Sequence, residues 1–124
     1  PPRAVRLVHV PELLPSDTVY LTVPELVERW QITPSRLRRM IDDHYLAAVR
    51  IDGVLRIPAE FVAGDEPLSS LRGTLLALHD AGFSGDEAVA WLLNENDELG
   101  ERPIAALNAG RKSAVRRATQ ALAF

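Results

Sequence analysis

Residues 22 to 57 constrain the fold of this chain more than any other stretch. They contain two short amphipathic helical patterns separated by a three-residue turn, followed by a predicted β-hairpin at residues 47–57. The apolar residues of the first pattern recur at the i, i+3, i+4 and i+7 spacing of one helix face. They are Val23, Leu26, Val27 and Trp30. Two helices of this length with so short a link predict a helix-turn-helix.

Helix-capping residues mark where both helices begin. Thr22, with Glu25 three residues later, forms the capping-box pattern, in which each side chain satisfies a free backbone N–H. Thr33 is the expected cap of the second helix, and Pro34 occupies its first position, where the missing N–H costs nothing. We therefore expect the second helix over residues 34–44.

The second helix carries three arginines and no acidic residue in its first two turns. Arg36 and Arg39 are predicted to share an outward face with Ser35, and Arg38 lies beside them. The net charge of the chain is −3, yet residues 33–57 contain five Arg against three Asp. The local field at a docking face matters more for binding a polyanion than the total charge does. This pattern is typical of a protein that lays one helix in a DNA groove and flanks it with a wing.

The predicted hairpin turns at Asp52-Gly53, and two registers compete for it. A two-residue loop places Arg50 and Arg56 on opposite faces, whereas a three-residue loop pairs Ile51 with Leu55 and places the two arginines side by side. The second register gathers four large aliphatic side chains on one face, so we favour it. Two like charges side by side are destabilising unless an anion lies over them. A phosphate backbone is the obvious candidate for that anion.

The chain is long enough for one full core or two small ones. We expect an extended arm over residues 1–17 with a short strand over 4–10, a winged helix-turn-helix domain over 18–64 and a C-terminal helical domain over 65–124. The last segment shows only helical patterns, one of them opened by a second capping box at Ser84 and Glu87. The predicted fold class is mainly α with a small β-hairpin, a winged helix-turn-helix followed by a C-terminal helical bundle packed against it.

Several classes of protein are excluded by what the sequence lacks. It has no cysteine, which rules out disulfides, zinc ribbons and thiol catalysis. It has no apolar run of membrane-spanning length, no phosphate loop, no dinucleotide fingerprint and no nucleophile elbow. His9, His44 and His79 lie far apart in sequence, without metal-ligand spacing. We therefore expect a cytoplasmic, non-enzymatic protein with no cofactor, no metal, no small-molecule substrate and no membrane partner.

Two strings in the first half resemble a known family. They are YLTVPELVERWQITPSRLRRMI, which begins at Tyr20, and AVRIDGVLRIP, which begins at Ala48. Over residues 20–63 the chain resembles the excisionase and Mer-type winged helix-turn-helix family. Gln31 departs from the family pattern, because many members have glycine in that turn. The long coiled coil and effector pocket of Mer-type regulators are also missing, so the resemblance implies no ligand sensing.

The resemblance assigns a role to each candidate site residue. It implies that Ser35, Arg36 and Arg39 reach base edges in the major groove and that Arg38 lies near the DNA backbone. It also implies that the wing contacts are Arg50 and Arg56.

The second half carries a further resemblance. Residues 81–123 are similar to the small helical domain of antitoxins that pair with NAD-degrading toxins, through Trp91, Leu99-Gly100, Arg102-Pro103 and Gly110-Arg111. The whole arrangement resembles a family of short actinobacterial DNA-binding proteins, among which a Ser/Thr-kinase substrate is known. These resemblances imply double-stranded DNA as partner, a role in transcription regulation, a homodimer or protein partner through residues 68–124, and phosphorylation by a Ser/Thr kinase. The alternative is an antitoxin-like or adaptor protein whose C-terminal helical domain binds a protein partner.

Overall fold

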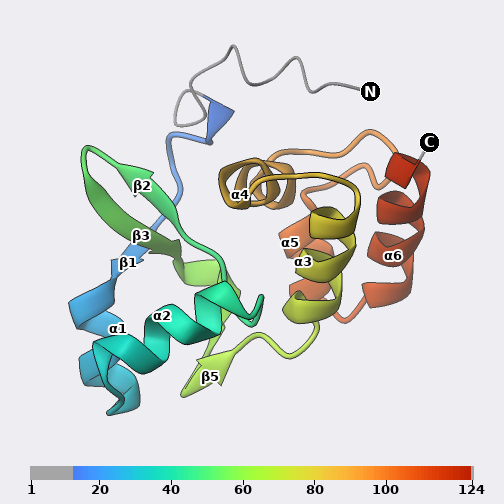
Figure 1. Ribbon diagram of the computed structural model, residues 1–124. Helices are drawn as coiled ribbons and strands as arrows, with labels where there is room; N and C mark the ends of the chain where they lie inside the picture. Colours follow the sequence, from blue (N-terminus) through green and yellow to red (C-terminus); the bar gives the residue numbers. More distant parts are fainter. Residues whose placement is uncertain (1–12, 124) are drawn as a thin grey trace.

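The computed structural model describes residues 13–123, shown in Figure 1. Most of the predicted arm, including the strand expected over residues 4–10, lies outside the described residues. The elements in chain order are β1 (Tyr20–Thr22), α1 (Val23–Trp30), α2 (Pro34–Asp42), β2 (Val49–Ile51), β3 (Val54–Pro58), the 3₁₀ turn η3 (Ala59–Phe61), β4 (Val62–Ala63), β5 (Glu66–Pro67), α3 (Leu71–Asp80), α4 (Gly85–Leu93), α5 (Pro103–Asn108), α6 (Lys112–Gln120) and η4 (Ala121–Ala123). The predicted fold class is confirmed.

Helices α1 and α2 form the predicted helix-turn-helix, and both predicted caps are present. The Thr22 hydroxyl accepts a hydrogen bond from the N–H of Glu25, whose carboxylate accepts one from the N–H of Thr22 at 2.8 Å. The Thr33 hydroxyl accepts a hydrogen bond from the N–H of Arg36 at 3.1 Å. These local bonds fix where each helix starts, because they satisfy N–H groups that have no partner inside the helix.

Two residues in left-handed conformation mark where the same helices end. Gln31 follows α1 at φ 54 and His44 follows α2 at φ 66, a region that non-glycine residues enter at an energetic cost. The second helix therefore stops at Asp42, two residues before its predicted end. Gln31 takes this conformation in place of a glycine, and its side chain donates a hydrogen bond to the Glu28 carbonyl at 2.7 Å.

The register of the wing hairpin differs from the one that the sequence favoured. Strands β1, β3 and β2 form an antiparallel sheet with β3 at its centre. Arg50 lies opposite Leu55 and Ile51 lies opposite Val54, so the loop contains two residues and not three. Asp52-Gly53 has φ values of 52 and 78, the two positive angles of a type I′ turn. This turn matches the right-handed twist of the strands it joins.

The favoured register was wrong because it assumed that only one face of the sheet is buried. Leu21 and Ile57 lie opposite each other on β1 and β3 and are buried on the face that α1 covers. Val49 is also fully buried, and α4 packs against its strand β2. The aliphatic side chains therefore do not have to share one face, and Arg50 and Arg56 lie on opposite faces.

The C-terminal helices pack as the predicted bundle, with α6 against α3 and α5 and with α4 against the same two helices. Ser84 and Glu87 form the second predicted capping box. A two-stranded ribbon of β4 and β5 spans the predicted boundary between residues 64 and 65. The Trp30 indole N–H donates a hydrogen bond to the Gly64 carbonyl at 2.8 Å and so holds this ribbon against α1.

One hydrophobic core runs through both halves of the described chain. The same cluster of buried side chains contains Leu37 and Phe61 from the winged part and Leu78, Leu92 and Ile104 from the C-terminal helices. In Figure 1 the winged part lies on the left and α3, α5 and α6 lie on the right, with α4 between them. None of the described helices is both long enough and apolar enough to cross a lipid bilayer.

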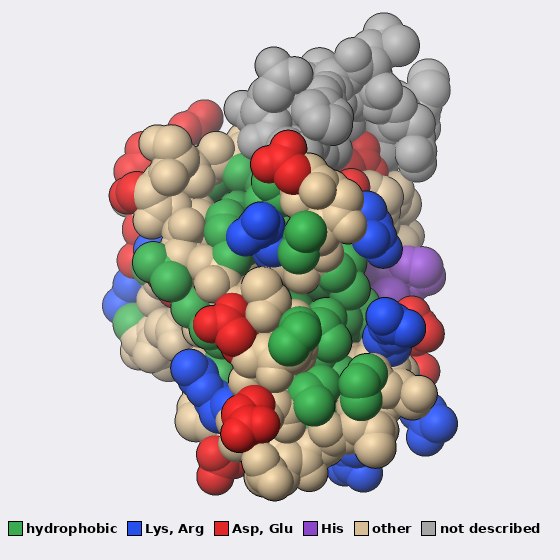
Figure 2. Space-filling model, turned by 90° about the vertical axis from the view of Figure 1, so that its left-hand side faces the viewer, with side chains coloured by type: hydrophobic (Ala, Val, Ile, Leu, Met, Phe, Trp, Pro, Cys, Tyr) green, Lys and Arg blue, Asp and Glu red, His purple; other side chains and the backbone are tan. Residues whose placement is uncertain are grey.

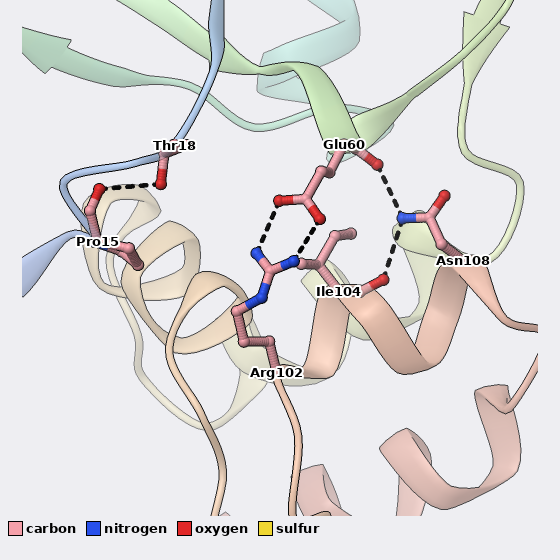
Figure 3. Close-up of polar contacts among 6 residues, drawn as sticks. All are labelled: Pro15, Thr18, Glu60, Arg102, Ile104 and Asn108. Atoms are coloured by element: carbon pink, nitrogen blue, oxygen red, sulfur yellow. Dashed lines mark hydrogen bonds and ion pairs between the residues drawn. The ribbon is translucent and has the colours of Figure 1, made fainter.

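Polar contacts add to the junction between the halves, as Figure 3 shows around Glu60. The Arg102 guanidinium donates hydrogen bonds to both Glu60 carboxylate oxygens, at 2.7 and 2.6 Å, and the Asn108 amide donates one to the Glu60 carbonyl at 3.1 Å. The hydrogen bond with Glu60 raises the pKa of Arg102. A bidentate pair of this kind fixes orientation as well as distance.

Candidate nucleic-acid interface

Helix α2 presents its arginines to solvent. Successive residues of an α-helix are turned by about 100°, so the fully buried Leu37 defines the inward side. Ser35 and Arg39 then point most directly away from the core, with Arg36 and Arg38 on the two flanks. All four side chains are exposed.

The cations of α2 are also free of acidic partners. The described residues form ion pairs at Arg102 and Arg111 only, and no side-chain hydrogen bond of Arg36, Arg38 or Arg39 occurs within that part of the chain. Asp42 lies on the same helix without pairing with any of them. The helix therefore offers three guanidinium groups whose donors are all available to a ligand.

The structure brings Arg38 and Arg50 together across a groove between the helix-turn-helix and the wing. This groove, of about 320 Å³, is lined by the start of α1 at Thr22, Val23 and Pro24, by Arg38 of α2, and by Arg50, Gly53, Val54 and Leu55 of the wing. Arg50 also donates a long hydrogen bond of 3.3 Å to the Gly53 carbonyl, which directs its guanidinium along the hairpin. Two cations on opposite walls of one groove suit an anion between them.

Arg56 does not join this groove. It lies opposite Val49 on the other face of the hairpin, where it is half-buried. Its Nε is buried and has no hydrogen-bond partner among the described residues. Burial raises the pKa of the nearby Tyr20 phenol, and the charge of Arg56 opposes that rise. The predicted pairing of Arg50 with Arg56 as adjacent wing cations is therefore wrong.

Figure 2 looks directly at the winged side of the molecule and shows how charge is arranged there. Lys and Arg side chains (blue) and acidic side chains (red) are interspersed around a hydrophobic centre. Val54, beside the turn of the wing, is an exposed apolar side chain with 41% of its surface accessible. Exposed guanidinium groups next to apolar side chains allow contact with both phosphates and base edges.

The far end of α2 is held by the C-terminal half, a feature that the sequence did not reveal. Arg72 of α3 donates a hydrogen bond to the Asp43 carbonyl at 3.1 Å, and its guanidinium lies 4.3 Å from the centre of the Tyr45 ring. The rings of His44 and His79 lie 4.7 Å apart beside this contact. No group of three or more potential metal ligands gathers among the described residues, so this pair lacks the further ligands of a metal site.

Comparison with known proteins assigns both halves to one family. The family model described as DNA-binding protein Rv2175c, wHTH domain, matches residues 9–62, and that of the Rv2175c C-terminal domain of unknown function matches residues 68–123. The chain belongs to this winged helix-turn-helix DNA-binding family. The two matches agree with the order of the halves in the fold.

A relative and a solved structure extend this similarity over almost the whole chain. The DNA-binding protein Rv2175c of Mycobacterium tuberculosis (strain ATCC 25618 / H37Rv) is 28% identical, over 91% of this chain and 86% of the relative. The NMR structure of Rv2175c superposes with a TM-score of 0.79 at 28% identity, covering 90% of this chain and 85% of that one.

Proposed function

We propose that this protein binds duplex DNA in the cytoplasm through α2 and the wing, and that it regulates transcription. Ser35, Arg36 and Arg39 reach base edges in the major groove. Arg38 and Arg50 hold the phosphate backbone from the two sides of their shared groove. We leave Arg56 out of this set, because its place on the other face of the hairpin directs it away from the groove.

The observation that carries the proposal is the unpaired state of the α2 arginines. A surface arginine whose role is structural has a carboxylate or a ring beside it, as Arg102 and Arg72 have here. Arg36 and Arg39 have neither among the described residues, although they lie on the second helix of a helix-turn-helix. A guanidinium in that position matches the paired acceptors on the major-groove edge of guanine.

The size of the module limits how tightly one copy binds. A single winged domain buries roughly 600–1,000 Å² on DNA, which is small for a site-specific complex. We therefore expect a second copy or a partner to be needed for tight binding at one site. The two phosphate contacts of Arg38 and Arg50 give a log–log dependence of affinity on salt with a slope of about −2.

The decisive experiment replaces Arg39 with alanine. Loss of its bidentate base contact should cost about 1–3 kcal/mol of binding on a selected site and relax the preference at one base pair. The site is first found by selection from a random duplex library, and affinity is then measured by fluorescence anisotropy.

The matched control is Arg29→Ala, which removes an equally exposed cation from the last turn of α1. It should change affinity little and leave the base preference unchanged. Equal losses in Arg29→Ala and Arg39→Ala, or unchanged binding in Arg36→Ala/Arg39→Ala, would rule out α2 as the recognition helix.

The rival hypothesis is an antitoxin-like or adaptor protein that binds a protein partner through residues 68–124. Protein interfaces place apolar anchors at their centre. The large apolar side chains that are exposed in the described chain are Leu13, Val19, Tyr45 and Val54, and all precede residue 65. This distribution favours the DNA-binding role over the rival.

A further inference from the structure

Free cations in the C-terminal half are concentrated on one helix. Residues 65–124 contain six basic side chains, and three of them are engaged. Arg72 bonds to the segment after α2, Arg102 pairs with Glu60 and Arg111 pairs with Glu101. The other three are Lys112, Arg116 and Arg117, which all lie on α6.

Helix α6 is exposed along its charged side and carries no acidic residue. Val115 and Ala118 are buried toward α3 and α5, so the three cations are on the solvent side. None of the three forms an ion pair within the described part of the chain. The half of the molecule that supplies the whole negative net charge therefore has one face of opposite sign.

A groove lined by both polar and apolar side chains, Leu76 and Ala77 among the latter, runs between this helix and α3. It has a volume of about 510 Å³, and its lining includes Lys112 and Arg116 of α6 and Ser69, Ser70 and Gly73 at the start of α3. Gln120 and Asp80 also line it, and Asp80 is its one acidic residue. Lysine, arginine, hydroxyl and amide side chains are those that contact phosphate oxygens in protein–DNA complexes.

The chemistry of this surface selects a phosphate backbone over an acidic protein. A protein partner requires an apolar anchor in a desolvated pocket. The large exposed apolar side chains of the described residues all precede residue 65, so α6 offers charge without such an anchor. DNA carries one negative charge per 1.7 Å of its axis, and it binds to rows of cations without apolar contact.

We propose that α6 and the groove beside it bind the phosphate backbone of a second duplex segment, so that one molecule joins two segments of DNA. This inference rests on the proposed role of α2 in binding the first segment. Figure 1 shows α2 and the wing on the left of the molecule and α6 at its right edge, facing away from them. A short straight duplex held by α2 therefore does not reach α6, and a second duplex is free to occupy it.

The experiment measures whether the full chain links two duplexes. A short biotinylated duplex on beads is incubated with protein and with a fluorescent duplex that has no biotin, and the captured fluorescence is measured. The test variant is Lys112→Gln/Arg116→Gln/Arg117→Gln. The matched control, Arg36→Gln/Arg38→Gln/Arg39→Gln, removes the same charge from α2, and glutamine is as good a helix former as the residues replaced.

While the first duplex saturates α2, the wild type should bind the fluorescent duplex with a log–log salt slope near −2.7, because about three phosphate contacts are made by α6. The α6 variant should lose capture about tenfold or more at low salt and keep its affinity for the first duplex. The α2 variant should lose its affinity for the first duplex. Circular dichroism verifies that each variant has the wild-type helix content.

Each other outcome identifies which idea fails. Capture that persists in the α6 variant, or a wild type that binds one duplex and captures no second, overturns the bridging role and leaves the α2 proposal intact. Loss of first-duplex binding in the α6 variant, with binding kept in the α2 variant, overturns the proposed function instead. A DNA-free dimer that only the α6 variant abolishes shows that this face binds a second copy of the chain.

Discussion

Arginine side chains in this protein differ in what surrounds each guanidinium group. Arg102 and Arg111 pair with carboxylates, and Arg72 lies over the Tyr45 ring. The arginines of α2 have no such neighbours among the described residues. A guanidinium that is already paired must give up one contact to make another, whereas an unpaired one exchanges only water. The same residue type is therefore structural in one place and available for binding in another.

The wing offers a direct test of this distinction, because its two arginines lie on opposite faces. Arg50→Ala should weaken binding to all duplex sequences alike and reduce the steepness of the salt dependence by about one unit of slope, since one phosphate contact is lost. Affinity measured by fluorescence anisotropy at several salt concentrations gives both quantities.

Arg56→Ala is the matched control on the same hairpin. It removes an equal charge from the face opposite the groove and should leave the salt slope unchanged. The assignment of Arg50 would be wrong if its replacement left the slope as in the wild type, or if Arg56→Ala reduced the slope by the same amount.

At the scale of single elements, the start of α1 shows how a local motif supports the candidate interface. Thr22 lines the groove of Arg38 and Arg50, and its bonds with Glu25 fix the first turn of the helix. The backbone N–H and the hydroxyl of Thr22 both donate to the Glu25 carboxylate, at 2.8 and 3.0 Å. These two hydrogen bonds favour the ionised carboxylate and lower the pKa of Glu25 below its usual 4.5.

This lowered pKa predicts a specific dependence of stability on pH. Because the folded-state pKa lies below the unfolded-state value, ionised Glu25 stabilises the fold above pH 4.5, and this contribution is lost as the pH falls through the folded-state pKa. Glu25→Gln should therefore show a smaller fall in the free energy of unfolding below pH 4.5. Urea titrations at a series of pH values measure this free energy. The control is Glu28→Gln, which removes an exposed carboxylate outside the cap. Identical pH profiles for wild type and Glu25→Gln would contradict the role of the cap.

The same elements show what could be predicted from the sequence. The capping boxes and the helical spacing of Leu26 and Trp30 involve neighbours in the chain, so local rules were enough to place α1 and α2. The hairpin register was not local, because it depended on α4 covering the second face of the sheet at Val49. Without that contact, burying all aliphatic side chains on one face was the better choice, and it gave the wrong partners for Arg50.

Contacts between distant segments were beyond prediction for the same reason. Arg38 and Arg50 line one groove because of the way α2 crosses the wing. The ring contact between His44 and His79 depends in the same way on how α3 is placed relative to the end of α2. The candidate residues of α2 followed from one helix and its periodicity. The surface they form with the wing, and the second cationic surface on α6, required the tertiary packing.

At the scale of the whole molecule, the two halves share more than the sequence-based division into residues 18–64 and 65–124 suggests. Phe61 and Ile104 belong to one buried cluster, and the Glu60–Arg102 pair lies beside it. Arg72 holds the segment that follows α2. Unfolding of the C-terminal helices would expose Val49 and remove this support from α2. The orientation of α2 thus depends on the C-terminal half.

This continuity predicts that the described chain unfolds in one cooperative transition. The two tryptophans report on different halves, because Trp30 lies in α1 and Trp91 in α4. In Trp91→Phe the fluorescence follows Trp30, and in Trp30→Phe it follows Trp91. Within each variant, the urea midpoint from fluorescence should coincide with the midpoint from far-ultraviolet circular dichroism, as two-state unfolding requires.

Comparing the two probes within one variant removes the effect of each substitution on stability, including loss of the hydrogen bond from Trp30 to Gly64. If the halves were independent, the Trp30 signal would change at a urea concentration different from that of the helical signal, which comes largely from α3 to α6. Separate midpoints would show that the shared core does not couple the halves, and the C-terminal half would then have no thermodynamic means of orienting α2. Coincident midpoints in both variants would mean that a core substitution in either half, even one far from the arginines, weakens DNA binding by unfolding the recognition helix.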